Sequence, residues 1–194
     1  MNVHSSSRER ILEASLALFV RQGFHGTPVP RIAREAGVAA GTIYRTFPSK
    51  DALVNVLYRE AKTNLLASLL NGLDVGAEPR QVFRQIWFRL AKHARAFPLE
   101  LAFLELHHHA SYLDEESKAL EEHAFEPFYA YFETERAREA FRSLPAPALM
   151  AIVLGAFFGL FKASLFGHLE WDEVVVAEAE VAVWDAVSRP RKEA

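Results

Sequence analysis

Residues able to bind a polyanion are concentrated in one short stretch, residues 27–50, which combines hydroxyl groups with cations. Within it, Arg45 falls on the side of an expected helix over residues 40–47 that is opposite Ile43 and Phe47. The two donors of an arginine fork match O6 and N7 of guanine, so Arg45 is the residue best suited to read a base. The chemistry that this stretch predicts is therefore recognition of nucleic acid.

Three adjacent histidines, His107, His108 and His109, are the other group that could do chemistry. Neighbours on a helix point about 100° apart, so three in a row cannot converge on one metal ion. Glu105 with His109, and His108 with Tyr112, have better spacing, but the HExxH pattern of zinc enzymes is absent. We predict no metal site, and we leave open a polar corner of a ligand pocket or a solvated helix end.

The chain contains no cysteine, which excludes disulfides, zinc–thiolate sites and thiol catalysis. No nucleophile, base and orienting group form a recognisable catalytic set, and no glycine-rich phosphate loop is present. An enzyme with a helical body is the rival that these observations disfavour. The sequence therefore predicts a protein that is not an enzyme, with no catalytic residues and no cofactor.

Two short helices joined by a tight turn are expected to carry the polyanion-binding stretch. Thr27 is a suitable N-cap for the first helix, and Pro28 suits the first helical position. Gly37 should end this helix, because glycine adopts the left-handed conformation without a penalty. Pro48 should stop the second helix. Helix, glycine turn and helix form the layout of a DNA-binding helix-turn-helix, here over residues 28–47.

The order IAxxAGVxxGTxYxxFxSKxxL over residues 32–53 resembles the TetR family of bacterial transcriptional regulators. RERILEASLALFVRQGFHGT resembles the first helix of that family and its connection, so the resemblance is specific over residues 5–65. It implies that residues on and beside the second helix contact DNA. These residues are Thr27, Ala39, Ala40, Gly41, Thr42, Tyr44, Arg45, Thr46 and Lys50.

The resemblance also implies separate roles within this set. Thr27, Tyr44 and Lys50 are similar to phosphate-binding residues of the family, and Gly41 would let the backbone approach a phosphate closely. The sequence departs from the family where Ala39 and Ala40 replace a hydroxyl residue and a residue that is often a cation. Thr46 stands at a position that is frequently histidine. We expect the recognition helix to lack an N-cap side chain and to bind phosphates less tightly.

The resemblance further implies an all-α fold of about nine helices, with a three-helix head and a larger ligand-binding and dimerisation body. We predict a flexible arm over residues 1–4, a DNA-binding domain over 5–65 and an effector-binding and dimerisation domain over 66–194. The function implied is a ligand-responsive regulator, expected to be a repressor. A dimer would bind a near-palindromic double-stranded operator and release it when a small, largely apolar or aromatic effector binds.

Charge is distributed unevenly along the chain. Residues 1–62 hold 9 Lys/Arg and 5 Asp/Glu, whereas the remainder holds 13 and 20, within a net charge of -3. A basic N-terminal part on an acidic body suits a polyanionic partner at that end only. The opening MNVHSSSRER is polar and does not resemble a signal peptide, so a cytoplasmic location is expected.

The body is rich in aromatic residues, which can fill a core or line an apolar cavity, and the sequence does not separate these alternatives. If a cavity binds the effector, we expect it near Trp87, Phe103, His107 and Phe128. Pro127 should kink or divide a long helical pattern, because its ring clashes with the preceding turn.

An uncharged run over residues 143–161 could be a membrane span or a buried helix. A span needs about 20 apolar residues, and this run starts with a loop that contains two prolines. We therefore predict a buried helix and no membrane partner. Small residues four apart would let a second helix approach closely, so the last two long helices are expected to form a homodimer. The predicted interface residues are Gly155, Phe158, Gly159, Val174, Val181 and Trp184.

Overall fold

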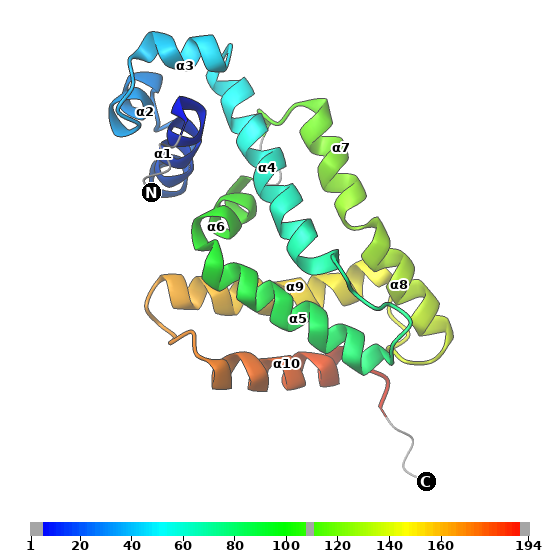
Figure 1. Ribbon diagram of the computed structural model, residues 1–194. Coiled ribbons are helices and arrows are strands. Elements are labelled where there is room, and N and C mark those ends of the chain that lie inside the picture. Colours follow the sequence, from blue (N-terminus) through cyan, green and yellow to red (C-terminus); the bar gives the residue numbers. More distant parts are fainter. Residues whose placement is uncertain (1–5, 108–110, 191–194) are drawn as a thin grey trace. The chain divides into compact units, whose positions relative to one another are not determined.

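The computed structural model describes residues 6–107 and 111–190, and these fold into ten helices and no strand (Figure 1). The all-α class is confirmed. Pro127 accounts for one division of the helical pattern, since α7 ends at Ala124 and α8 begins at Glu126. The helices are α1 Ser7–Gln22, α2 Val29–Glu35, α3 Ala40–Thr46, α4 Lys50–Leu70, α5 Pro79–Ala96, α6 Pro98–His107, α7 Glu115–Ala124, α8 Glu126–Ala137, α9 Ala146–Leu165 and α10 Glu173–Val187.

The chain forms two compact units, and each is described by itself. The head unit comprises Met1–Leu65 and Phe97–Glu121, and the body unit comprises Leu66–Ala96 and Glu122–Ala194. The helix α4 belongs to the head unit up to Leu65. The first segment of the head unit therefore ends where the predicted DNA-binding domain ends, but α6 and most of α7 belong to the same unit.

The head unit is built around α1, whose start is fixed by a capping box. The Ser6 hydroxyl accepts a hydrogen bond from the Glu9 backbone N–H at 3.2 Å, and the Glu9 carboxylate accepts one from the Ser6 N–H at 2.8 Å. The buried face of α1 packs against α2, α3 and α6. Phe19 of α1 stacks on Phe103 of α6, with ring centroids 6.2 Å apart. The core of the head therefore includes residues from a helix far along the sequence.

The body unit is held by aromatic side chains between α5, α9 and α10. Trp87 of α5 is 2% exposed, and its indole N–H donates to the Val176 carbonyl of α10 at 2.9 Å. Its ring meets Phe157 of α9 edge-on, with centroids 5.3 Å apart. Arg80 of α5 forms a two-pronged ion pair with the fully buried Glu180 of α10. A buried carboxylate requires such a partner.

The helix α9 differs from its prediction, because it is buried on one face only. Leu149, Phe157 and Phe161 face the core, whereas Gly155 and Gly159 lie on an exposed face. Among the described residues, α9 is the one helix long and apolar enough to cross a membrane, and only 22% of its apolar window is buried. Within a single chain this helix therefore leaves an apolar face uncovered.

Candidate nucleic-acid interface

The helices α2 and α3 form the predicted helix-turn-helix. Gly37 between them has a φ of 63°, in the left-handed region that favours glycine. The next residue, Val38, donates its N–H to the Ala33 carbonyl at 2.9 Å, which closes the C-terminus of α2. Ile43 and Phe47 are 1% and 3% exposed and fix α3 against the core of the head. The predicted turn and the predicted buried face of α3 are both confirmed.

The outer face of α3 is exposed and polar. Tyr44 is 55% exposed, and Arg45 and Thr46 are also exposed. The Thr46 hydroxyl donates to the Thr42 carbonyl within the helix at 2.9 Å, so its oxygen remains able to accept another bond. The Arg45 side chain makes no hydrogen bond or ion pair with any of the described residues. Its guanidinium N–H groups can therefore donate to another molecule.

The N-terminus of α3 lacks a side-chain cap, as expected from Ala39 and Ala40. Ala39 occupies the N-cap position and provides no side-chain hydrogen bond. Ala40 and Gly41 are exposed, Thr42 is half-buried, and a Cβ placed at Gly41 would meet no atom within 4 Å. Another molecule can therefore approach this end of the helix closely. Direct DNA contacts of these residues stay a prediction.

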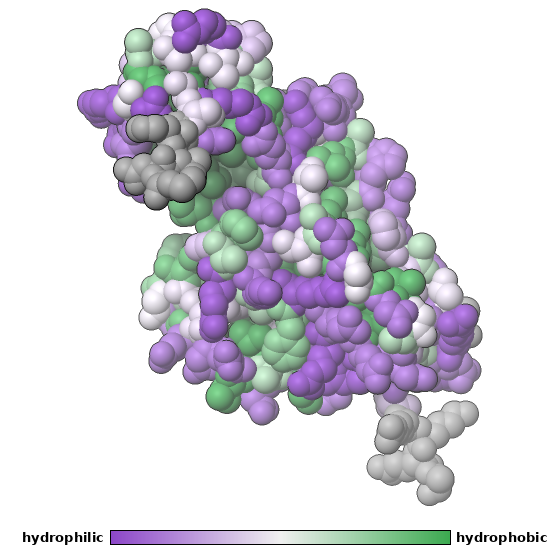
Figure 2. Space-filling model, in the orientation of Figure 1, coloured by the Kyte–Doolittle hydropathy of each residue, from purple (hydrophilic) through white to green (hydrophobic). Residues whose placement is uncertain are grey.

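Two arginines of α2 belong to the same surface and were missed from the sequence. Arg31 and Arg34 are exposed, and neither side chain makes a hydrogen bond or ion pair within the part of the chain that the structure describes. They are one helical turn apart on the side away from buried Ile32. This spacing could have identified them. Figure 2 shows that the surface over α2 and α3 is mostly hydrophilic.

Lys50 lies at the start of α4, as expected, but it is also bound within the head. Its ammonium donates to the carbonyls of Phe24 at 2.8 Å and of Thr27 at 3.3 Å. The same group lies over the Phe24 ring, 4.0 Å from its centroid. An ammonium has three donors, and these contacts use two of them. Lys50 therefore joins the α1–α2 connection to α4, and its contact with a phosphate stays a prediction.

The prediction that Thr27 caps α2 is wrong. Thr27 is completely buried, and its hydroxyl donates back to the Gly23 carbonyl at 2.8 Å. The N-cap position of α2 is occupied by Pro28, which provides no side-chain cap. The Thr27 hydroxyl is bonded to the C-terminal end of α1 and does not cap α2, whereas its contact with a phosphate stays a prediction.

The four residues predicted to line an effector pocket are divided between the two units. Phe103 is completely buried in the head unit, and Trp87 is buried in the core of the body unit with its N–H already bonded. Both are packed as core residues of their units, and their assignment to an effector pocket stays a prediction. Phe128 is half-buried in α8, and His107 ends α6. His108 and His109 lie outside the described residues, as does the predicted pairing of His109 with Glu105.

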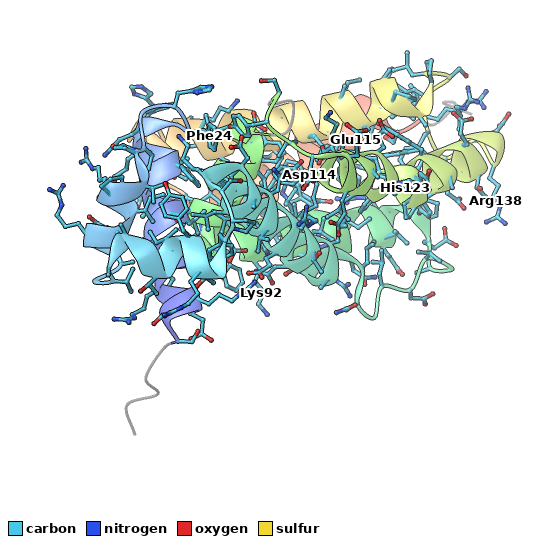
Figure 3. The ribbon with its side chains drawn as sticks, turned by 90° about the horizontal axis from the view of Figure 1, so that it is seen from above. Phe24, Lys92, Asp114, Glu115, His123 and Arg138 are labelled. Atoms are coloured by element: carbon cyan, nitrogen blue, oxygen red, sulfur yellow. The ribbon has the colours of Figure 1, made fainter. Side chains whose placement is uncertain are left out.

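The body unit has a pocket of about 410 Å³ that sequence analysis did not find. It lies between the start of α5, the end of α8 and Trp184 of α10. Its lining residues do not include Trp87, Phe103, His107 or Phe128. Its walls carry Glu135, which is buried, and Arg138, whose side chain is exposed at the end of α8 (Figure 3). Four of its nine lining residues are charged, and this does not suit a purely apolar ligand.

The residues predicted at a dimer interface divide into two groups. Val174 and Val181 of α10 are 68% and 43% exposed, and a Cβ at Gly155 or Gly159 of α9 would meet no atom within 4 Å. Trp184 is half-buried and packs against two rings of its own chain, and its place at the interface stays a prediction. Its ring lies 5.3 Å from that of Phe83 and 5.7 Å from that of Phe141. Phe158 is half-buried and meets Phe157 edge-on.

Two curated relatives are similar to the N-terminal part of the chain. The HTH-type transcriptional repressor KstR of Rhodococcus jostii is 45% identical over 60 residues, which are 30% of this chain and 28% of that protein. The HTH-type transcriptional regulator RutR of Escherichia coli is 34% identical over 87 residues, or 45% of this chain and 36% of that protein. The matches thus span less than half the length of either relative.

The fold is shared with a crystal structure of a TetR family transcription regulator from Marinobacter aquaeolei. The two chains are 22% identical, with a TM-score of 0.83 over 95% of this chain and 96% of the other. Residues 11–57 match the family of bacterial regulatory proteins named after tetR, and residues 58–189 match a tetracyclin repressor-like C-terminal domain. The protein is therefore a helix-turn-helix regulator of transcription that belongs to the TetR family.

Proposed function

We propose that this protein binds a near-palindromic DNA operator as a dimer, with α3 in the major groove, and that it represses transcription. The observation that carries the proposal is the outward position of Arg45 on α3, whose opposite face is locked by buried Ile43 and Phe47. A base-reading side chain needs a rigid support, and a guanidinium without an internal partner is free to bind guanine. The unpaired Arg31 and Arg34 supply further positive charge on the same two helices.

We propose a dimer because one head carries only one recognition helix. A single recognition helix reads one half-site, and a specific operator of this class has two, about one helical turn of DNA apart. The exposed face of α9 and the exposed valines of α10 are the surfaces that we assign to dimerisation. The same two helices placed together in two copies would form a four-helix interface.

The effector is proposed to be small and largely apolar or aromatic. The support for this proposal is the aromatic content of the body unit, where rings of Phe83, Phe157 and Trp171 gather around Trp87 and its neighbours. Its binding would release the operator, and the site of action would be the cytoplasm, where the chromosome is accessible. A panel of planar apolar compounds, followed by the melting temperature and by operator release, tests this part. Hits confined to sugars or highly charged metabolites would contradict it.

Replacing Arg45 with alanine tests the DNA-binding assignment. The operator is first selected from a library of random duplexes, or sought as an inverted repeat upstream of the gene. We expect Arg45→Ala to lose about 1–3 kcal/mol of binding free energy per half-site and to relax the preference at one base position. Arg95→Ala is the matched control, because Arg95 is an exposed arginine of the body unit. Equal losses for every base at every position would make Arg45 a phosphate contact instead.

A further inference from the structure

The connection between α6 and α7 is fixed to α4 by one buried side chain, Asn55. This residue is 2% exposed, yet its amide is fully bonded. Its oxygen accepts from the Asp114 N–H at 2.8 Å, and its nitrogen donates to the carbonyls of Tyr112 at 2.9 Å and of Asp51 at 2.8 Å. A buried amide that satisfies backbone groups of Tyr112 and Asp114 holds these two residues in position beside α4.

A second anchor lies one turn further along α4. Arg59 donates to both carboxylate oxygens of Asp114, at 3.0 and 2.9 Å, and to the Ser117 hydroxyl at 3.0 Å. Asp114 also caps α7 by accepting from the Ser117 N–H at 2.9 Å. These hydrogen bonds hold the pKa of Asp114 below its usual value, although partial burial acts in the opposite direction. The start of α7 is thus attached to α4 at two successive turns.

The side chain of Tyr112 extends this attachment to the DNA-binding helices. Its ring stacks on that of Phe24, with centroids 4.0 Å apart and an angle of 25° between the planes. Phe24 lies on the α1–α2 connection and is 7% exposed. Lys50 covers the same ring and binds the Phe24 carbonyl, as described above. Figure 3 labels Phe24 and also Asp114, which lies just before α7.

We propose that Tyr112 is a positioning residue for DNA binding, which acts through Phe24 on the ammonium of Lys50. The proposal rests on the proposed function, and it adds a residue that lies outside the matched N-terminal stretch 11–57. The Phe24 ring is held by Tyr112 and in turn supports Lys50 and the residues just before α2. Loss of the Tyr112 ring would leave Phe24 and Lys50 less well ordered, so the head would have to order them when it binds DNA.

The first test compares operator binding by three variants. Tyr112→Ala removes the stacked ring and is expected to weaken binding about two- to tenfold, the range set by the strength of aromatic pairs. Tyr112→Phe keeps the ring and should bind like the natural protein. Tyr129→Ala, a half-buried tyrosine of α8 in the body unit, is the matched control and should also bind normally. If Tyr112→Ala binds the operator as tightly as the natural protein, the proposal is wrong.

A double-mutant cycle distinguishes positioning from a general loss of stability. If Tyr112 acts through Lys50, the effects of Tyr112→Ala and Lys50→Ala on operator affinity should not add. Additive effects, within about twofold, would overturn the proposal, because independent sites behave in that way. If Tyr112→Ala unfolds at the assay temperature, Tyr112→Leu keeps the apolar volume and replaces it in the same cycle. Absence of DNA binding by the natural protein would instead refute the proposed function.

Discussion

At the scale of single residues, the Lys50 ammonium has two roles, one in holding the head together and one, which we propose, in binding DNA. Two of its donors hold the carbonyls of Phe24 and Thr27, and the remaining donor is the one that we assign to a phosphate. Its place at the N-terminus of α4 favours an anion, because the helix dipole adds to the charge. A substitution at this position should therefore change both folding stability and DNA binding.

We expect Lys50→Ala to lower the free energy of unfolding by about 1–3 kcal/mol, the range for hydrogen bonds that involve a charged group. Binding to all DNA sequences should weaken alike, and the salt dependence should fall by about one counterion per protomer. Urea unfolding and titrations at several salt concentrations measure the two effects. The control is Lys118→Ala, which removes an exposed lysine of α7 in the same unit. A variant with unchanged stability would show that the carbonyl contacts contribute nothing.

Glu100 of α6 gives a second prediction at this scale. Burial raises the pKa of this carboxyl above its usual value, and nearby Glu60 adds to the effect, although Asn64 donates to the carboxylate at 2.7 Å. A raised folded-state pKa means that ionisation of Glu100 opposes folding. The cost is therefore present above the folded pKa and disappears below the usual value of 4.5, where both states are protonated.

We expect Glu100→Gln to raise the free energy of unfolding at pH 7, because glutamine keeps an oxygen for Asn64 without the charge. The gain should shrink as the pH falls through the raised folded-state pKa of Glu100, and it should be absent below 4.5, the ordinary pKa of a glutamate. Urea unfolding at a series of pH values measures this dependence. Glu122→Gln, on the exposed end of α7, should show no such gain. A stability difference that grows toward acid pH would mean that the sign of the shift is reversed.

Some roles of individual residues could be predicted from the sequence, and others could not. Gly37 and Ile43 could be assigned from the sequence, because backbone conformation and helical spacing depend on near neighbours. The hydroxyl of Thr27 and the role of Lys50 in holding the head together could not, since both depend on where the end of α1 lies in space. Trp87 and Phe103 were assigned to a pocket because a core ring and a cavity ring look alike in sequence.

At the scale of elements, α6 is the least expected part of the head unit. Its Leu101 and Phe103 are completely buried, and α6 packs against α1. The ends of α2 and α3 could be predicted, because Gly37 and Pro48 mark them locally. The pairing of α6 with α1 was missed, since a helical pattern shows which face is buried and does not identify the partner helix.

This packing leads to a prediction about Phe103. Because Phe103 is a core residue, Phe103→Ala should lower the free energy of unfolding of the protein by about 3–5 kcal/mol. The loss should appear in the melting temperature of the protein without any ligand. Phe166→Ala is the matched control, because Phe166 is 74% exposed in the body unit. If Phe103→Ala kept its stability and lost only the response to an effector, the residue would belong to a pocket after all.

At the scale of the whole molecule, the single chain leaves an apolar surface uncovered. Ile152 and Leu165 of α9 are 37% and 50% exposed, and Val174 of α10 is 68% exposed. Several exposed large apolar residues on two long helices indicate an interface with another protein or with lipid. Exposed Lys162 and acidic residues such as Glu173 interrupt this surface, which favours a second copy of the chain over the interior of a bilayer.

Gly159→Glu tests this dimer, because the single chain has room for the new side chain. A Cβ at Gly159 would meet no atom within 4 Å, so the substituted protomer should fold. At a packed two-fold interface the carboxylate would be buried without a partner, which costs several kcal/mol. We therefore expect a dimer at micromolar concentration to become a folded monomer that no longer binds the operator.

Sedimentation, circular dichroism and operator titration together decide the outcome. Ala130→Glu places the same charge on an exposed position of α8 and should leave the dimer intact. A natural protein that sediments as a monomer at micromolar concentration would contradict the dimer, as would a Gly159→Glu variant that stays dimeric. Partitioning of the natural protein into detergent would instead assign the exposed face of α9 to lipid. Because a single head carries only one recognition helix, loss of the dimer should abolish specific binding even though every DNA-contacting residue remains in place.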